Sequence, residues 1–190
     1  MKDNLAYQEP VWEELIGGRT VAMSPRPTTN HNRTAGNIYR IFGAYLDGHK
    51  CEPFPDGVEL YLTKEDRFVP DGMVVCDPDK VQPDGVHGVP DLVVEVLSPS
   101  TAKYDRGHKK DVYEKCGVQE YWIVDPANRT VEQYLLEEGR LELHTIHALL
   151  ADWMWEKLNE AERADVTSEF RCSLFSDLTI RLEDIFRRVL

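Results

Sequence analysis

The spacing of apolar and polar positions predicts a chain in which strands and helices alternate. Between Asn30 and Leu46, apolar residues recur at i, i+3, i+4 and i+7, which is typical of an amphipathic helix. The run from Leu92 to Leu97 is apolar except at Glu95. Such a run is typical of a central strand covered on both faces. We therefore expect helices to pack on a sheet that contains residues 92–97.

Shorter stretches predict the remaining elements. Further strands are expected at 19–23, 58–62, 67–76, 120–124, 130–136 and 140–146. Further helices are expected at 11–16, from the Ser100 or Thr101 cap to about 116, at 148–164 and at 182–189, and a loop at 77–90. The strand-helix-strand order from 92 to 124 indicates a parallel crossover.

The length and composition fit one globular unit. A chain of 190 residues suits a single α/β domain, residues 1–190, with a mixed central β-sheet flanked by helices and a helical insertion near 148–165. With 42% hydrophobic and 29% charged residues, disorder is not expected.

The longest apolar run is far shorter than the roughly 20 residues of a membrane-spanning helix. The residues from Met1 to Asn4 do not begin a signal-peptide core, so we expect a cytoplasmic protein with no membrane partner. The chain has four scattered cysteines without a C-x-x-C pair, and buried free thiols are the expected state. They are Cys51, Cys76, Cys116 and Cys172.

Glu95 is the most informative residue of the sequence. Period-2 alternation places it on the same strand face as Val93 and Leu97, within an otherwise apolar run. A buried, unpaired carboxylate is costly, so such a residue is neutralised, ion-paired or bound to a metal. Metal binding is the simplest explanation. An ion pair with Lys or Arg from a covering helix, or a more exposed strand end, are the alternatives.

A metal site needs a second oxygen ligand, and two Pro-Asp pairs could supply it. Asp91 lies four residues before Glu95 on the same strand, so their Cα atoms would be roughly 13 Å apart, too far for one ion. Asp71 lies on a strand that could pair beside residues 92–97 and bring both carboxylates to one cation. We therefore choose Asp71 as the ligand and expect Asp91 to cap the strand.

Motifs along nearly the whole chain match those of a known family. They are Glu14-Leu15-Ile16, Met23-Ser24-Pro25, His31, Val69-Pro70-Asp71, PDLVVEVLSPST at 90–101, Asp105-Arg106-Gly107 with Lys109, and GVQEYWIVDP at 117–126. As a set they resemble the Uma-type restriction endonucleases, which are placed in the PD-(D/E)XK nuclease superfamily. The resemblance implies a restriction-endonuclease-like core that hydrolyses DNA phosphodiester bonds.

The resemblance also implies roles for three residues. Asp71 and Glu95 would hold Mg²⁺, or Mn²⁺, and a lysine two positions after the acid would orient the attacking water. That position is Leu97 here, which departs from the superfamily pattern. The Uma-type pattern instead has a lysine on the following helix, which corresponds to Lys109. Helical spacing puts Lys109 on a stripe with Val112 that faces the sheet, although a surface lysine in a basic helix is the alternative.

Candidate substrate contacts lie on either side of these residues. The stretch 103–115 has five basic residues against three acidic ones, so Lys103 and Arg106 could contact phosphate, although an ordinary solvated face fits as well. His31 matches a family histidine and could lie at the edge of the site, with helix capping or packing as its alternative. The net charge of −12 argues against tight non-specific binding of nucleic acid.

Three functions remain open from the sequence. The first is an Mg²⁺-dependent DNA endonuclease with Asp71, Glu95 and Lys109 as catalytic residues. The second is a non-catalytic binding or assembly module that keeps the nuclease fold, and the third is a phosphodiesterase acting on a substrate other than DNA. Trp153 and Trp155, in the helical segment, could serve a homodimer interface.

Overall fold

The computed structural model describes residues 13–22 and 27–190 of the chain. The helices are α1 (Thr29–Leu46), α2 (Ala102–Tyr104), α3 (Lys110–Cys116), α4 (Asp152–Trp155), α5 (Glu160–Asp165) and α6 (Leu182–Ile185), with a 3₁₀ turn at Pro78–Lys80 and a π turn at Asp105–Lys109. The strands are β1 (Glu13–Ile16), β2 (Arg19–Ala22), β3 (Glu52–Pro55), β4 (Leu60–Tyr61), β5 (Arg67–Phe68), β6 (Gly72–Val75), β7 (Val81–Gln82), β8 (Gly85–His87), β9 (Leu92–Val96), β10 (Glu120–Asp125), β11 (Thr130–Glu137), β12 (Arg140–Ala148), β13 (Glu169–Arg171) and β14 (Thr179–Arg181).

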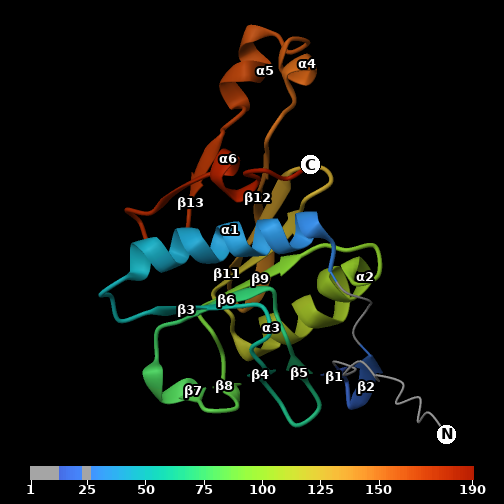
Figure 1. The fold of residues 1–190 in the computed structure, drawn as a ribbon, viewed down its shortest axis with the longest axis vertical. Helices are drawn as coiled ribbons and strands as arrows, with labels where there is room; N and C mark the ends of the chain where they lie inside the picture. Colours follow the sequence, from blue (N-terminus) through green and yellow to red (C-terminus); the bar gives the residue numbers. More distant parts are fainter. Residues whose placement is uncertain (1–12, 23–26) are drawn as a thin grey trace, which may run out of the picture.

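A mixed central sheet organises the fold. Its strand order is β12-β11-β10-β9-β6-β3. Strands β9 and β10 are parallel and the other neighbouring pairs are antiparallel. The predicted mixed sheet and the parallel crossover are therefore confirmed. Figure 1 shows α1 running across one side of this sheet, while α2 and α3 lie on the other side.

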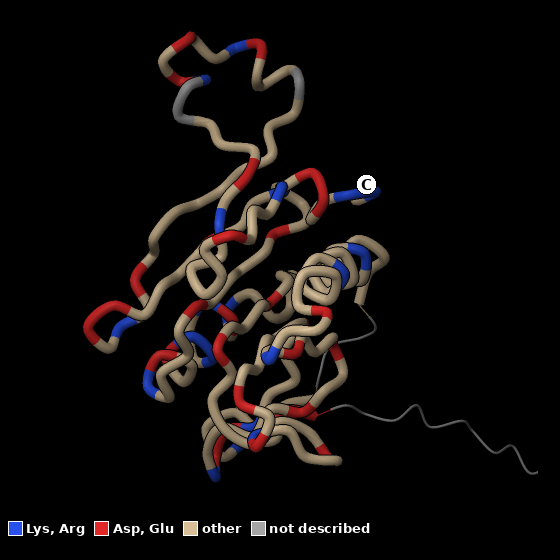
Figure 2. Tube along the Cα trace, turned by 90° about the vertical axis from the view of Figure 1, so that its left-hand side faces the viewer, with Lys and Arg blue, Asp and Glu red and all other residues tan. Residues whose placement is uncertain are grey.

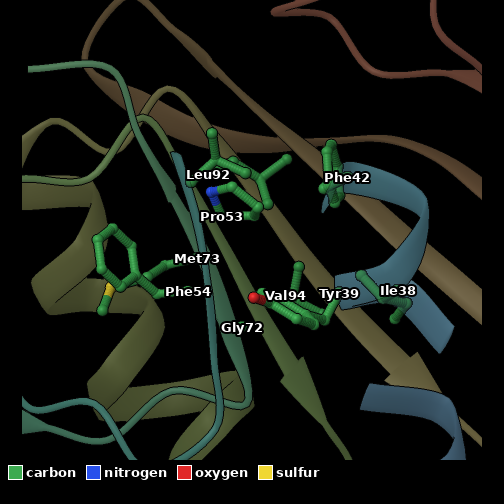
Figure 3. Close-up of a pocket in the computed structure, with 10 residues that line it drawn as sticks. Ile38, Tyr39, Phe42, Pro53, Phe54, Gly72, Met73, Leu92 and Val94 are labelled. Atoms are coloured by element: carbon green, nitrogen blue, oxygen red, sulfur yellow. The ribbon is translucent and has the colours of Figure 1, made fainter. Parts of the chain in front are cut away.

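The two faces of the sheet belong to two separate cores. Val94 of β9 packs in the same core as Ile38 and Phe42 of α1. Val93 packs in the other core, with Tyr113 of α3. A shallow apolar pocket lies on the α1 face, where Ile38 and Phe42 approach Val94 (Figure 3). Since neighbouring strand residues point to opposite faces, Glu95 lies on the α3 face, away from this pocket.

A second sheet was not predicted. Its order is β2-β1-β5-β4-β8-β7. The helix expected at 11–16 is wrong where the chain is described, because Glu13–Ile16 forms β1, and Val11 and Trp12 lie outside the described residues. Gly17 and Gly18 have φ of 56° and 73°, which is the conformation of a two-residue hairpin turn between β1 and β2.

Three further expectations are corrected. The single strand expected at 67–76 is divided between β5 and β6, which belong to different sheets, and the break lies at Pro70, which has no N–H to donate. The loop expected at 77–90 contains β7 and β8. The last helix is α6 alone, shorter than 182–189, and the β13-β14 hairpin before it was missed.

The segment expected to form a helical insertion contains two short helices, α4 and α5. In Figure 1 it projects from the end of the central sheet. The indole side chains of Trp153 and Trp155 are exposed, so the homodimer interface remains a prediction. Within residues 13–22 and 27–190, no helix is both long and apolar enough to cross a membrane.

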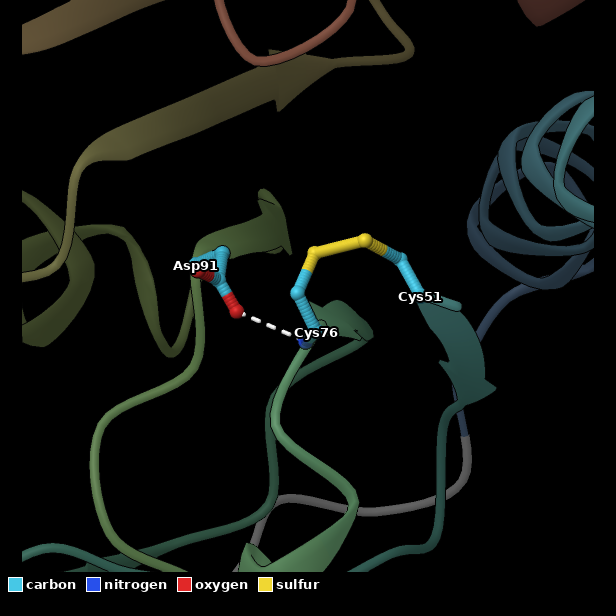
Figure 4. The surroundings of a disulfide bond; sticks show 3 residues. All are labelled: Cys51, Cys76 and Asp91. Carbon is cyan, nitrogen blue, oxygen red and sulfur yellow. Dashed lines mark hydrogen bonds between the residues drawn. A yellow bond between two sulfur atoms is a disulfide. The ribbon is translucent and has the colours of Figure 1, made fainter. Parts of the chain in front are cut away.

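The expected free thiols are wrong for two of the four cysteines. Cys51 and Cys76 form a disulfide that joins the start of β3 to the end of β6. Asp91 accepts a hydrogen bond from the backbone N–H of Cys76 at 2.7 Å (Figure 4). The pairing was hidden from the sequence because the two cysteines become neighbours only when β3 and β6 pair. Cys116 and Cys172 are free, as predicted, but only Cys172 is buried, and Cys116 is half-buried.

We expect the unreduced protein, unfolded in urea, to react with a thiol reagent at two cysteines, and at four after reduction. Replacing both Cys51 and Cys76 by serine should lower the free energy of unfolding by about 2–4 kcal/mol, because the unfolded chain loses a cross-link. Urea unfolding measures this loss. Four reactive thiols before reduction would show that the disulfide does not form.

Candidate active site

Asp71 and Glu95 come together through strand pairing. Gly72 of β6 lies opposite Val94 of β9 in an antiparallel register. The next position along this register therefore sets Asp71 opposite Glu95. The Asp71 carboxylate also accepts a hydrogen bond from the backbone N–H of Val96 at 2.6 Å. Two carboxylates from different parts of the sequence are thus brought to one end of the β6-β9 pair, near enough for the negative charge of Asp71 to raise the pKa of Glu95.

Lys109 approaches Glu95 from the helical layer. Its Nζ lies 3.1 Å from Oε1 of Glu95, and its side chain is 3% exposed. Val112, on the same stripe, is buried as well. The lysine from the covering helix, foreseen as an alternative to a metal at Glu95, is therefore present as an ion pair in the structure. Because Lys109 is buried, it is not one of the surface lysines of this basic segment.

The environment of Glu95 opposes its ionisation. Burial raises the pKa of this carboxyl well above its usual value, and the negative charges of Asp105 and Asp71 act in the same direction, against the lowering effect of Lys109. Tyr113 donates a hydrogen bond to the same Oε1 at 2.8 Å. The pKa of Lys109 is raised, because its carboxylate neighbours outweigh the effect of burial. These neighbours therefore favour the ammonium form of Lys109.

Glu14 is a member of this cluster that received no role in the sequence analysis. Its Oε1 lies 2.9 Å from Nζ of Lys109 and accepts a hydrogen bond from the backbone N–H of Val69 at 2.9 Å. The residue is buried on β1. Once 13–16 is read as a strand, Glu14 and Ile16 share its buried face, and this alternation was the signal that could have found it.

Asp105 is the second member without an assigned role. Its side chain is 1% exposed, and Oδ1 lies 3.7 Å from Nζ of Lys109, four residues along the chain. Burial raises the pKa of Asp105, whereas Lys109 and Thr101 lower it by a smaller amount. The i, i+4 spacing of an acid and a lysine was visible in the sequence, but the depth of Asp105 was not.

His31 contacts the other side of Asp71. Its Nε2 lies 3.2 Å from Oδ1 of Asp71. Burial lowers the pKa of His31, but the hydrogen bond and the charge of Asp71 outweigh it and raise the pKa overall. The backbone N–H of His31 is also capped by the Thr28 side chain. His31 therefore lies both at the start of α1 and at the edge of the site, so the two interpretations of this residue do not exclude each other.

The two predicted phosphate contacts are not joined to this cluster. Lys103 is exposed on α2. The Arg106 guanidinium pairs with Glu132 of β11 at 2.5 Å, so an incoming phosphate would compete with a carboxylate for it. Figure 2 shows the basic positions scattered among acidic ones along the trace. Along residues 13–22 and 27–190, the basic positions therefore form no continuous run beside the site.

The donor set suits a hard divalent cation. Asp71 and Glu95 are carboxylates, the ligands that Mg²⁺ and Mn²⁺ prefer. Among residues 13–22 and 27–190, hydrogen bonds to Glu95 reach only Oε1, which leaves Oε2 for a cation. No group of three or more His, Cys, Asp or Glu side chains in that part of the chain is arranged to hold a metal. Two carboxylates are consistent with Mg²⁺, which usually keeps several waters and takes further oxygens from phosphate.

Comparison with known proteins identifies relatives of this chain. The sequence model of the Uma2 family, described as "Putative restriction endonuclease", matches residues 4–166. Two uncharacterized proteins of Synechocystis sp. are similar. The protein slr1290 is 32% identical over 64% of this chain and 64% of its own length, and sll1609 is 30% identical over 64% and 70%. The chain therefore spans a little under two thirds of the length of slr1290.

A solved structure has the same fold. It comes from Anabaena variabilis and is described as "a putative nuclease belonging to DUF820". The two chains superpose with a TM-score of 0.69 over 94% of this chain and 91% of the other. At 18% identity, the likeness concerns the fold alone.

Proposed function

Because the chain belongs to the Uma2 family, whose description is "Putative restriction endonuclease", we propose that it is a Mg²⁺- or Mn²⁺-dependent endonuclease that hydrolyses DNA phosphodiester bonds. One observation carries the proposal. A buried lysine contacts Glu95 at the end of β9 where the neighbouring strand β6 brings in Asp71. Two carboxylates can hold the cation that metal-assisted phosphodiester hydrolysis requires, and the lysine beside Glu95 adds a positive charge.

In this proposal Asp71 and Glu95 hold the cation. When bound, a divalent cation lowers the pKa of a water molecule and stabilises the charge that develops on the scissile phosphate. The carboxylates around Lys109 favour its ammonium form, so the role we assign to it is to orient the attacking water and to supply positive charge, not to accept a proton. Tyr113 fixes the Glu95 carboxylate through its hydrogen bond, and His31 fixes Asp71 in the same way.

Substrate contacts are proposed for three side chains. His31 would lie beside the scissile phosphate, because it already contacts Asp71. Lys103 and Arg106 would meet the DNA backbone farther away, and Arg106 would have to exchange Glu132 for phosphate. With a net charge of −12, binding should be weak, or specific, and sensitive to salt.

A specific observation favours one other function. Lys109 is an ion-pair partner for Glu95 within the protein itself, which would suit a non-catalytic binding module that keeps the nuclease fold. The two proposals differ in cation binding, because the endonuclease needs a divalent cation at Asp71 and the module does not.

Nicking of supercoiled DNA tests the proposal. In Mg²⁺ or Mn²⁺, Asp71→Asn should nick at least about 100-fold more slowly than the wild type, more than the loss typical of a residue that only supports a metal ligand. The amide keeps an oxygen that can accept the Val96 hydrogen bond, so the fold should survive. Asp79→Asn is the matched control, because it removes the same charge from an exposed turn after β6.

Equal nicking by the wild type and Asp71→Asn would show that the activity comes from another site or from a contaminant. A wild type that binds the metal and cleaves small phosphodiesters, but no form of DNA, would point to a different phosphate substrate. A wild type that binds no metal would leave the non-catalytic module.

A further inference from the structure

Asp105 has a buried carboxylate, and neither of its oxygens has a hydrogen bond of good geometry to another described residue. Thr101 lies near enough to lower the pKa of Asp105, but its hydroxyl instead pairs with Ser98 at 3.0 Å. The side chain is 1% exposed. Burying an ionisable group in this way costs several kcal/mol unless another group compensates, and native proteins rarely leave such groups unsatisfied. The nearest cation is Lys109, at 3.7 Å, beyond hydrogen-bond distance. Asp105 thus lies close to the Lys109 ammonium but does not form a hydrogen bond with it.

The backbone holds Asp105 in this place. Asp105–Lys109 form a π turn between α2 and α3, in which Gly107 has the non-helical angles φ −115° and ψ −105°. Such turns within helices are frequent at functional sites. Tyr121 of the central sheet donates a hydrogen bond to the backbone carbonyl of Asp105 at 2.9 Å. The carboxylate is therefore fixed on the same turn as the lysine it accompanies.

The Lys109 ammonium has three acidic neighbours, which differ in their other interactions. Glu14 is closest, but its Oε1 also accepts the Val69 hydrogen bond. Glu95 is a ligand in the proposed function. A cation at Asp71 and Glu95 would draw Glu95 away from the lysine and repel the ammonium. Asp105 is the neighbour that has free acceptor oxygens.

We propose that Asp105 is a positioning residue. It becomes the hydrogen-bonded ion-pair partner of the Lys109 ammonium when a divalent cation binds Asp71 and Glu95. This inference rests on the proposed function. The movement needed is small, because the two groups already lie 3.7 Å apart. Without Asp105, the cation and the lysine would compete for Glu95, so metal binding would weaken and Lys109 would lose its defined position.

Calorimetric titration with Mn²⁺ tests the first consequence. Asp105→Asn should bind Mn²⁺ about 10–100-fold more weakly than the wild type, which is the usual cost of losing a group that supports a metal ligand. Asp105→Glu, which restores the carboxylate, should recover part of the affinity. Asp111→Asn removes the same charge from the exposed side of α3, and its affinity should stay within about twofold of the wild type.

The ¹⁵N signal of the Lys109 ammonium tests the mechanism, since loss of charge alone would not move the lysine. The signal can be assigned as the one missing in Lys109→Arg. In the wild type it should shift when Mg²⁺ is added and remain sharp, as expected for an ammonium with a fixed partner. In Asp105→Asn it should broaden or vanish under the same conditions.

Unchanged Mn²⁺ affinity in Asp105→Asn, or a Lys109 signal that does not respond to Mg²⁺ in a wild type that binds it, would overturn this inference alone. The second result does not depend on Asp105→Asn, so it decides the matter even where that variant fails to fold. A wild type that binds neither cation would remove the proposed function and the inference together.

Discussion

Replacing Lys109 by methionine is expected to lower the free energy of unfolding by about 3–5 kcal/mol at pH 8, because it leaves buried carboxylates without their counter-ion. The ammonium lies within 3.7 Å of Glu14, Glu95 and Asp105. Methionine fills a similar volume, so the loss should come from charge and not from a cavity. Urea unfolding of the wild type and the variant measures the difference.

The loss should depend on pH in a defined direction. The pKa values of Glu95 and Asp105 are raised by burial, and Lys109 holds them down in part. Without Lys109 they rise further. An acid whose pKa is higher in the folded state than in the unfolded state binds protons preferentially in the folded state. Stability is therefore lost as the pH rises from the unfolded-state pKa to the folded-state pKa. Lys109→Met should therefore be less destabilised at pH 5 than at pH 8.

The exposed Lys115 on the same helix provides the control. Lys115→Met should change the free energy of unfolding by no more than about 0.5 kcal/mol. Adding Glu95→Gln to Lys109→Met should cost less than the two single losses added together, because the pair is coupled. A similar small loss in both lysine variants, independent of pH, would mean that Lys109 is solvated and not held in the carboxylate cluster.

The second large effect is expected at Glu120, where alanine should cost about 3–5 kcal/mol. Glu120 is fully buried on β10. Its Oε1 accepts hydrogen bonds from Trp122 and Gln133 at 2.6 and 2.7 Å. Its Oε2 accepts from the backbone N–H and the hydroxyl of Ser173, and from the Cys172 thiol. Alanine would leave these buried donors unsatisfied and detach the segment between β13 and β14 from the central sheet.

Glu120→Gln is the informative companion variant. It keeps the shape but replaces one acceptor oxygen by a donor, so it should cost less than alanine and still more than a surface change. Glu137→Ala, at the exposed end of β11, should be nearly neutral. A loss below about 1 kcal/mol for Glu120→Ala in urea unfolding would contradict the structural role of this network.

Local patterns predicted the centre of the fold well. The apolar spacing of 30–46 and the run 92–97 predicted α1 and β9 to within a residue. Helix α1 is long and amphipathic, and β9 is buried at every position, so burial sets both patterns. The same period-2 rule predicted that Glu95 faces into the protein. Asp91 was excluded as a second metal ligand from the rise per residue of a strand alone, because four residues of strand separate it from Glu95. In the structure Asp91 binds the Cys76 N–H at the other end of β9.

What escaped prediction depends on contacts between distant segments. Glu14 meets Lys109 only because β1 pairs with β5 in a second sheet. The sequence of β1 has only four residues, too few for their pattern to distinguish a strand from a helix. Asp105 resembles an ordinary helix-surface acid until the π turn is known. Glu120 was expected simply to belong to a buried strand, since its partners Cys172 and Ser173 lie some fifty residues away.

A calorimetric titration of Mn²⁺ into the wild-type protein and Asp71→Asn tests most directly whether Asp71 and Glu95 form a cation site. The wild type should bind Mn²⁺ with a saturable heat that Asp71→Asn loses, whereas Asp79→Asn should bind as the wild type does. A wild type that gives no binding heat in several buffers, and no protection against thermal unfolding by Mn²⁺ or Mg²⁺, would contradict the metal-dependent nuclease.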